Sequence, residues 1–507
     1  MNVLLYVVDA LRADHLSCYG YERATTPTLD ALAADGVRFE NCFSPATWTR
    51  PVAATLSTGL YPPAHGTRTR HDTLGESIPT LAEQFRDAGY ETVGVTSMGN
   101  VSTATGFDRG FDRFFDLYKD DDIVEKRETS TATDEELMTE EGTIALPRAE
   151  DVTDAMADWF DGRDSDKSFF AFCWSIEPHM PYDPPAGYDR FLDPRYEGPV
   201  DGSRESLKRV ETESDLDRLR ALYDAEIRYN DDWLDALMSA LRESGVFENT
   251  LICVVGDHGD AFEEHGRLTH GHAPYDELVR VPWIMRLPEE RNHRDGSPHV
   301  DDSVQNRGET EQRIKRGNDD GAVVSELTSL VDVYPTLIEA AGLEVPDRPA
   351  AITGRSQASI FDGVSVAGHD AVYFETQSYD MQNAFYGVRT PDWKYIRIER
   401  PEMDASTVLG LARYILKREI LIDILRHPRH YWRRYRYDDR ERLYDLKRDP
   451  GEQRNLATER ADRANEFERA LDTWLSACSE FLETEDSGQA NIDDQTRQQL
   501  RELGYAE

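Results

Sequence analysis

The chain has 507 residues, which is more than one hydrophobic core usually serves, so we expect a large domain with a smaller one. Its 98 acidic and 57 basic residues give a net charge of −41, and 39% of its residues are hydrophobic and 10% aromatic. This composition excludes a nucleic-acid-binding protein, which needs clustered lysine and arginine, and a disordered acidic chain, which is poor in aromatic residues. A carboxylate-rich surface is typical of adaptation to high salt, so we expect a halophilic source.

The opening residues, MNVLLYVVD, favour a buried strand over a targeting segment. They lack a basic start and a cleavage site, and Asp9 interrupts the apolar run. The five cysteines are scattered without CxxC spacing, as free thiols in a reducing compartment are. We therefore expect a cytoplasmic protein without a signal peptide or transmembrane segment.

Short apolar runs alternate with helical patterns through the first two thirds of the chain. The runs typical of buried strands are 3–8, 91–96, 169–175 and 250–255. The helical stretches between them are 78–88, 151–160 and 219–243. This alternation predicts an α/β fold with a large, mostly parallel mixed sheet flanked by helices. Two highly charged segments are expected to be solvated insertions, 119–141 and 289–321.

The remainder of the chain has a different pattern. An amphipathic helix is predicted after Glu326, ending at Gly342 with a proline soon after. Four short strands in close succession then predict a small antiparallel sheet, and a helix over 457–482 closes it; the strands are 371–375, 384–389, 393–397 and 442–446. We expect a catalytic α/β domain over 1–353 and a C-terminal α+β subdomain over 354–507.

Acidic residues and a histidine follow two of the predicted strands. Asp9 comes after VLLYVV, and Asp257 and His258 come after LICVVG. The carboxyl ends of parallel strands meet at one edge of a sheet, so these side chains predict a site for a divalent cation. The alternative is that each Asp caps a following helix.

Thr49 lies near the start of a helical stretch in SPATWTRPVAATLSTG. A hydroxyl at a helix start, close to a cation, is well placed to act as a nucleophile, and the same positive end of the helix attracts the oxyanion of an ester. The alternative is an ordinary threonine N-cap.

Five blocks of the chain carry a family resemblance: VLLYVVDALRADHLSCYGYERATTPTLDALAADGVRFENCFS, GDHGDAFEEHGRLTHGHAPYDELVRVPWIMR, SLVDVYPTLIEAAG, ERLYDLKRDPGEQRNLA and LRELGYAE. They are similar to the sulfatase family of the alkaline phosphatase superfamily, and they occur in family order from the first residue to the last. The resemblance implies the alkaline phosphatase/sulfatase-like fold, a large α/β domain with a small C-terminal antiparallel sheet plus helix.

The resemblance also implies roles for individual residues. Asp9 matches the first metal carboxylate, and Asp257 and His258 match the metal pair. His179 matches the histidine that contacts the ester or protonates the leaving group. His270 falls where a residue touches the bound anion, and a one-step shift would give that role to His272. One divalent cation is expected, Mn²⁺ first, with Ca²⁺, Mg²⁺ and Zn²⁺ as alternatives.

The chain departs from the family pattern in three places. Ala10 replaces a second metal carboxylate, as in the family's phosphonate and phosphodiester hydrolases. The family's C-x-P-S-R motif reads Thr49-Arg50-Pro51-Val52-Ala53 here, so its arginine is missing. The anion contact is then expected from Arg50, Arg12 or the histidines. Thr49 stands where sulfatases form formylglycine, and no formylglycine is expected from threonine; a covalent threonyl ester is predicted instead.

Three functions are compatible with these residues. The first is a metal-dependent hydrolase of sulfuric or related anionic esters. The second is a threonine-nucleophile phosphodiester or phosphonate ester hydrolase, or a phosphoglycerol-type transferase, acting on glycans or lipid head groups. The third is a non-catalytic descendant that binds a metal and a glycan. Retention of the metal residues and histidines together argues against the third. The expected partner is an anionic ester that is glycan, aryl or lipid-linked, and no nucleic acid.

One segment, 409–437, is basic and amphipathic within this acidic chain, LGLARYILKREILIDILRHPRHYWRRYRY. One hypothesis is a surface helix that makes peripheral contact with anionic lipid head groups or a polyanionic substrate. The alternative is a lid whose apolar face packs on the core and whose arginines pair with nearby acids.

Overall fold

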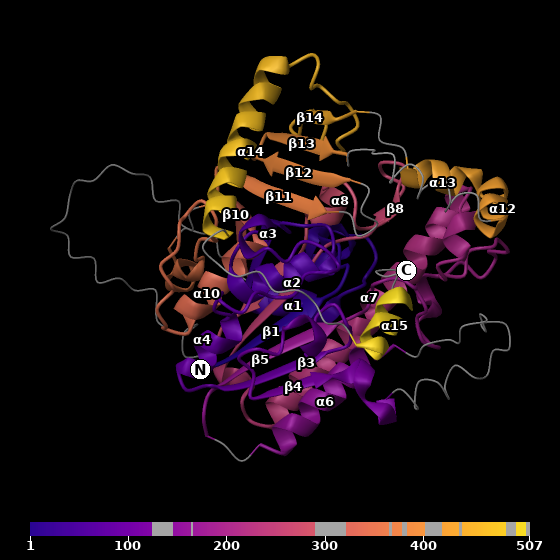
Figure 1. The fold of residues 1–507 in the computed structure, drawn as a ribbon. Coiled ribbons are helices and arrows are strands. Elements are labelled where there is room, and N and C mark those ends of the chain that lie inside the picture. The colour runs from indigo at the N-terminus through magenta and orange to yellow at the C-terminus, as the bar shows by residue number, and fades with distance from the viewer. Residues whose placement is uncertain are drawn as a thin grey trace.

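The computed structural model describes residues 1–123, 146–163, 166–288, 321–364, 368–377, 383–400, 418–435, 439–482 and 493–502. Its centre is an eight-stranded sheet in the order β10-β2-β9-β6-β1-β5-β3-β4 (Figure 1). The strands are β1 Asn2–Val8, β2 Val37–Phe43, β3 Glu91–Thr96, β4 Arg113–Asp116, β5 Phe169–Ser175, β6 Thr250–Gly256, β9 Trp283–Arg286 and β10 Ala322–Ser329. The predicted α/β fold with a mixed, mostly parallel sheet is confirmed, with β9 antiparallel to both of its neighbours.

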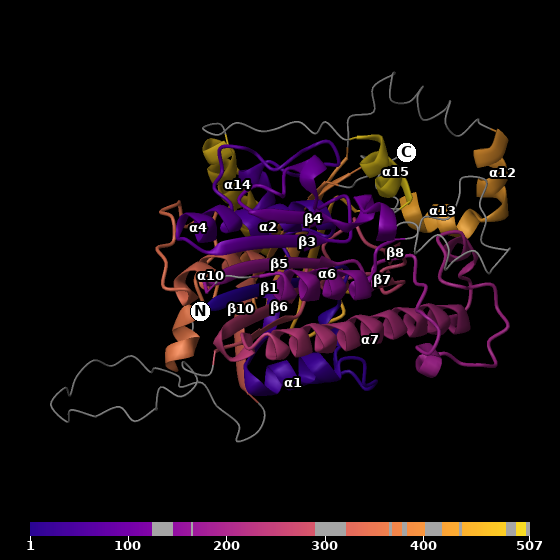
Figure 2. The same cartoon turned by 90° about the horizontal axis from the view of Figure 1, so that it is seen from below.

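Strand β1 lies in the middle of the sheet and is buried along its whole length. Because successive side chains of a strand point to opposite faces, β1 contributes to two separate cores. Leu5 and its alternate neighbours pack in one core with α2 Thr49–Thr58, α4 Leu81–Asp87 and α10 Val333–Ala340. Tyr6 and its alternate neighbours pack in the other with α1 Pro27–Asp35, α6 Ala149–Asp161 and α7 Glu213–Glu243. Figure 2 shows α1 and α7 on one face of the sheet and α2 and α4 on the other.

One predicted helix is wrong at its start. The residues directly after Glu326 belong to strand β10, and α10 begins only at Val333. Leu327, Thr328 and Ser329 pair in parallel with the end of β2. This pairing at the sheet edge satisfies their backbone groups and outweighs their helical pattern. The predicted insertions 119–141 and 289–321 fall mainly on 124–145 and 289–320, which lie outside the described residues.

A second, four-stranded antiparallel sheet follows, as predicted. It consists of β11 Val372–Gln377, β12 Ala384–Arg389, β13 Trp393–Glu399 and β14 Glu441–Asp445, and α14 Ala461–Leu482 covers it. The last described helix, α15 Asp494–Glu502, returns to the large sheet, where Gln499 donates to Ser97 O over 3.0 Å. The division at residue 353 stays a prediction. None of the helices in the described ranges is long and apolar enough to span a membrane.

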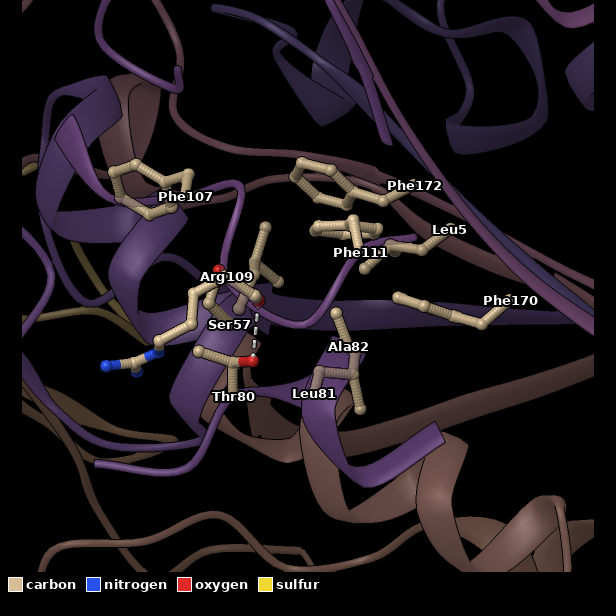
Figure 3. A pocket seen from close by; sticks show the side chains of 11 residues that line it. Leu5, Ser57, Thr80, Leu81, Ala82, Phe107, Arg109, Phe111, Phe170 and Phe172 are labelled. Atoms are coloured by element: carbon tan, nitrogen blue, oxygen red, sulfur yellow. Dashed lines mark hydrogen bonds between the residues drawn. The ribbon is translucent and has the colours of Figure 1, made fainter. Parts of the chain in front are cut away.

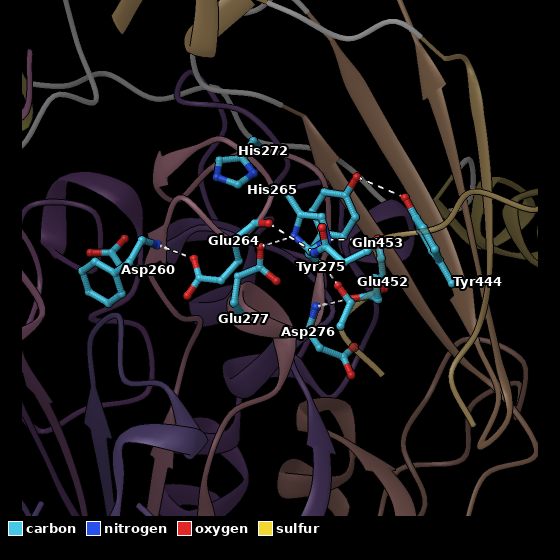
Figure 4. Close-up of polar contacts among 12 residues, drawn as sticks. Asp260, Glu264, His265, His272, Tyr275, Asp276, Glu277, Tyr444, Glu452 and Gln453 are labelled. Carbon is cyan, nitrogen blue, oxygen red and sulfur yellow. Dashed lines mark hydrogen bonds and ion pairs between the residues drawn. The ribbon is translucent and has the colours of Figure 1, made fainter. Parts of the chain in front are cut away.

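A buried ion network joins the two sheets (Figure 4). The Lys394 side chain, on β13, is fully buried, and its Nζ lies 2.8 Å from Asp276 and 2.9 Å from Glu452. Next to it, His265 Nδ1 lies 2.6 Å from Glu277, and the His265 ring stacks on Tyr275. Asp276 and Glu277 open α8 Asp276–Val279, so the network fixes this short helix of the large unit to the small sheet.

We expect Lys394→Met to lower the free energy of unfolding by roughly 3 kcal/mol, because it removes the cation that compensates the buried Glu452 carboxylate and the Asp276 carboxylate, whose side chain is 22% exposed. Denaturant unfolding of the full chain measures the change. The matched control is Lys447→Met: this lysine is 70% exposed and pairs with Asp392, so a loss under about 1 kcal/mol is expected. Equal effects of the two substitutions would contradict a stabilising role for the buried network.

Candidate active site

Two carboxylates stand side by side at the carboxyl ends of neighbouring strands. Asp9 follows β1 and Asp257 follows β6, and the two strands pair in parallel with Val8 opposite Gly256. His258 Nε2 lies 3.3 Å from Asp257 Oδ2 and 3.6 Å from Asp9 Oδ1. The three side chains offer ligand atoms that all lie within 4.8 Å of one another. The structure thus brings together the three residues that the sequence nominates for a metal.

The hydrogen bonds of these carboxylates fit a cation site. Asp9 Oδ2 accepts from Trp174 Nε1 over 3.0 Å, and Asp257 Oδ1 accepts from the backbone N–H groups of Ala10 and His258. Within the described part of the chain, Asp9 Oδ1 and Asp257 Oδ2 receive no hydrogen bond although both are buried. Burial raises the pKa of both carboxyl groups, and a bound cation would reverse that direction. The donor set of two carboxylates and one imidazole suits a divalent ion.

Thr49 lies against this group. It is the first residue of helix α2, and its side chain is fully buried. Its Oγ1 is 3.4 Å from Asp9 Oδ2 and 3.3 Å from His258 Nε2. The first-turn N–H groups of a helix lack intrahelical partners and carry partial positive charge. The hydroxyl therefore stands at the positive end of a helix and beside the three candidate metal ligands.

Two further histidines, His179 and His270, lie next to His258. The ring of His270 lies 4.5 Å from that of His258 and 4.8 Å from that of His179, measured between centroids. His270 Nδ1 lies 2.6 Å from Asp260 Oδ1, and His179 Nδ1 lies 2.6 Å from Met180 O. Burial, with repulsion from Arg204, lowers the pKa of His270 to about 3, and burial likewise lowers the pKa of His179. Both rings are neutral near pH 7, and each Nδ1–H donates to its oxygen partner.

The fourth predicted histidine, His272, is also buried, and its Nε2 lies 3.1 Å from Thr269 O. Exposure rises outward through the site, from 0% at Thr49 to 6% at His270 and 7% at His272. His270 and His272 thus have a small contact with solvent, and Thr49 has none. The role of His272 in substrate binding stays a prediction.

The arginines nominated from the sequence bind the protein itself. Arg50 Nη1 donates to Arg70 O over 2.5 Å, and Arg50 Nη2 donates to Asn100 Oδ1 over 2.9 Å. Arg12 forms ion pairs with Asp14 and Glu264. These contacts hold the loops around α2 and β1, and a substrate role for Arg50 stays a prediction.

Sequence reasoning did not nominate three residues that shape the site. Charge repulsion from Arg204 adds to burial in lowering the pKa of His179 and His270, and no motif marks the segment of Arg204. Trp174, at the end of β5, orients Asp9 through its indole N–H. Asp260 does have a sequence signal, because it is the fifth residue of the family block that begins GDHGD. Its carboxylate accepts a hydrogen bond from Tyr182 and positions His270.

A separate cavity lies between α2, α4 and the sheet, away from these residues (Figure 3). Its volume is about 10 Å³, and Leu5, Phe170 and Phe172 are among the side chains that line it. This volume is at the lower limit for a single water molecule. The cavity is a packing gap in the core and too small for a substrate.

These features define the class of protein, an α/β enzyme with a candidate metal site that suits anionic esters. They are the mixed sheet, the group of two carboxylates and one imidazole, and the hydroxyl at a helix start. Comparison with known families makes this specific, because the family model described as Sulfatase matches residues 1–343. The chain belongs to the sulfatase family, hydrolases of sulfuric or related anionic esters.

Individual relatives are distant but cover most of the chain. An arylsulfatase of Clostridium perfringens is 24% identical over 84% of this chain and 93% of its own. An N-acetylglucosamine-6-O-sulfatase of Bacteroides thetaiotaomicron is 23% identical over 87% and 88%. The crystal structure of a phosphonate monoester hydrolase of Agrobacterium radiobacter superposes with a TM-score of 0.66 at 21% identity, over 94% of this chain and 96% of that one. The last comparison confirms the fold expected from the sequence.

Adding Mn²⁺ to the metal-stripped protein should raise its unfolding temperature. Free ion at one hundred times its dissociation constant corresponds to about 2.7 kcal/mol of stabilisation. Asp257→Asn should lose most of this gain, because it removes one of two anionic ligands. Calorimetry with and without Mn²⁺, and the metal content of the purified protein, measure the effect.

The matched control is Glu205→Gln, in a second group formed with Asp423 and His427. There Lys208 Nζ lies 2.7 Å from Glu205 and 3.0 Å from Asp423, so a cation already balances both carboxylates. The control should respond to Mn²⁺ as the wild type does. A full response in Asp257→Asn would show that the ion binds elsewhere.

Proposed function

We propose that this chain hydrolyses anionic esters with Thr49 as the nucleophile, sulfuric esters being the first candidate substrates. The observation that supports the proposal is the Thr49 hydroxyl, 3.4 Å from Asp9 and 3.3 Å from His258 at the start of α2. A divalent cation held by Asp9, Asp257 and His258 would polarise the ester and favour the alkoxide form of the hydroxyl. Mn²⁺ is the ion we expect.

The reaction would proceed in two balanced steps. Thr49 Oγ1 forms a bond to the sulfur of R–O–SO₃⁻, the bond to the ester oxygen breaks, and R–OH leaves with the proton that Thr49 gave up. Water then attacks the threonyl sulfate, which releases sulfate and a proton and restores the hydroxyl. A bound anion raises the pKa of nearby imidazoles, so His179 or His270 can carry the proton between nucleophile and leaving group.

Arg204 is the residue we propose for anion binding in place of the missing motif arginine. Its charge acts on His179, His270 and Asp260, which supports a position beside the site. An arginine at this place would neutralise the ester oxygens on the solvent side of the cation. Asp260 would hold the His270 ring in one orientation during the reaction.

A phosphodiester or phosphonate ester is the second candidate substrate, and Thr49 and Ala10 favour it. Threonine retains a hydroxyl that can form a covalent phosphoester, and Ala10 leaves the cation with fewer anionic ligands. The phosphonate monoester hydrolase named above shares the fold. Transfer to an alcohol in place of water would make the same chemistry a phosphoglycerol-type transfer. A sulfated sugar, as in the name of the N-acetylglucosamine-6-O-sulfatase, fits the first candidate, a sulfuric ester. The halophilic source and the cytoplasmic location expected from the sequence stay predictions.

Turnover of an aryl sulfate, an aryl phosphodiester and an aryl phosphonate ester, in high salt with Mn²⁺, distinguishes the candidates. We expect Thr49→Ala to lower turnover by about 10³-fold or more and Thr49→Ser to keep most of it, because only the serine retains a nucleophile. Mass spectrometry of the peptide should find unmodified threonine. Wild-type turnover in Thr49→Ala, or a modified residue 49, would overturn the mechanism.

Arg204→Gln should lower kcat/KM by about 10- to 100-fold, mainly through KM, because a charge-assisted contact to an anion contributes ~1.5–3 kcal/mol. The matched control is Arg209→Gln, five residues further along the chain at an exposed position. It should leave both constants within about twofold, as surface substitutions do. Similar losses in both variants would show that Arg204 acts only through the overall charge of the surface and does not bind the anion.

A further inference from the structure

Helices α12 Arg418–Arg426 and α13 Pro428–Tyr435 project from one edge of the molecule (Figure 1). We call them the docking hairpin. Among the described residues, six large hydrophobic side chains are exposed, and four of them lie on this hairpin: Leu421, Ile422, Leu425 and Trp432. Leu425 is 72% exposed and Trp432 56%. The hairpin therefore carries most of the exposed large hydrophobic side chains in the described part of the chain.

The apolar side chains of α12 share one face, which is turned away from the body of the protein. Leu421 and Leu425 are four residues apart, and Ile422 and Leu425 are three apart, so all three lie together on the helix surface. Asp423 faces the body instead, where it pairs with Lys208 over 3.0 Å and accepts from Tyr431 over 2.6 Å. The hairpin is thus attached through Asp423, and its apolar face remains exposed to solvent and does not pack in a core.

The charge of the hairpin is opposite to that of the chain. Residues 418–435 contain five arginines and two acidic residues, in a chain of net charge −41. Arg426 and Arg429 are exposed, next to the apolar face. Apolar side chains flanked by arginines are the pattern of helices that lie in a membrane interface. Charges further away than about 8–10 Å are screened at 0.1–0.15 M salt, so the acidic remainder of the surface does not cancel this local attraction.

The hairpin also adjoins the entrance of the active site. Arg429 Nη1 donates to Glu211 O over 2.7 Å, and its Nη2 lies 3.6 Å from Glu263. Glu263 follows strand β7 Ala261–Phe262, which pairs with β8 Leu268–Thr269, and His270 comes directly after β8. Arg204 precedes the turn that holds Lys208. A surface bound by the hairpin would therefore lie next to the side of the site that carries His270 and Arg204.

We propose that the docking hairpin binds an anionic lipid surface, with Leu421, Ile422, Leu425 and Trp432 entering the interface and arginines contacting the head groups. This binding is peripheral and reversible, and it presents the active-site entrance to esters at the level of the head groups. It does not rest on the chemistry proposed above, because it requires no turnover.

Flotation with lipid vesicles tests the proposal on the full chain. The wild type should float with vesicles of equimolar phosphatidylglycerol and phosphatidylcholine and remain behind with phosphatidylcholine alone. Leu425→Ser combined with Trp432→Ser should weaken vesicle binding at least about tenfold, because the burial of these two side chains in the interface supplies the hydrophobic contribution to the affinity. The matched control is Val345→Ser combined with Val364→Ser, which alters the other two exposed hydrophobic residues and should bind as the wild type does.

Three results would overturn the proposal. The wild type fails to float with anionic vesicles, or the Leu425/Trp432 double variant floats as well as the wild type. In the third, light scattering finds a dimer that the double variant converts to a monomer, which would assign the surface to a second copy of the chain. Cooperative thermal unfolding of both double variants, at a temperature close to that of the wild type, shows that they are folded and keeps this test separate from that of Thr49.

Discussion

Two carboxylates that cannot both be charged without a partner dominate this structure. Asp9 and Asp257 stand at the ends of neighbouring parallel strands, are fully buried, and each has an oxygen without a hydrogen bond in the described part of the chain. Burial raises the pKa of both. Placing two such groups side by side in a dry interior is costly unless a cation lies between them. Trp174 and two backbone N–H groups hold the remaining oxygens and thereby fix the direction of the other two.

The side chains around this pair of carboxylates are compatible with a bound cation. The histidines nearest to it are buried and neutral, so they add donors and acceptors without repelling a cation. The positive charge of Arg204 acts on His270, and the positive end of α2 lies at Thr49. A cation bound by this pair, together with the positive end of α2, would attract an anionic ester toward Thr49.

The small C-terminal sheet contributes to the site from a distance. Its buried Lys394 binds Asp276, at the start of α8, and Glu452, whose backbone carbonyl contacts His265. The segment between Asp260 and Asp276 thus lies between the metal-ligating residues on one side and the buried ion network on the other. Because His270 belongs to this segment, the second sheet helps to keep its ring in place. Loss of the ion network would therefore affect the reaction by displacing His270 and would not change the charge of the site.

The sequence by itself determined four strands of the large sheet, including the two that end at Asp9 and Asp257, the helix start near Thr49 and the four strands of the small sheet. These are local signals: a buried strand is a continuous apolar run, and a helix end has its own residue preferences. Only the tertiary structure decided that Asp260 positions His270, that Arg50 and Arg12 bind protein atoms, and that β10 replaces the start of a predicted helix. It also decided which face of the docking hairpin meets solvent. The physical reason is that such contacts join residues tens to hundreds of positions apart, and their energies depend on burial and distance, which no local pattern encodes.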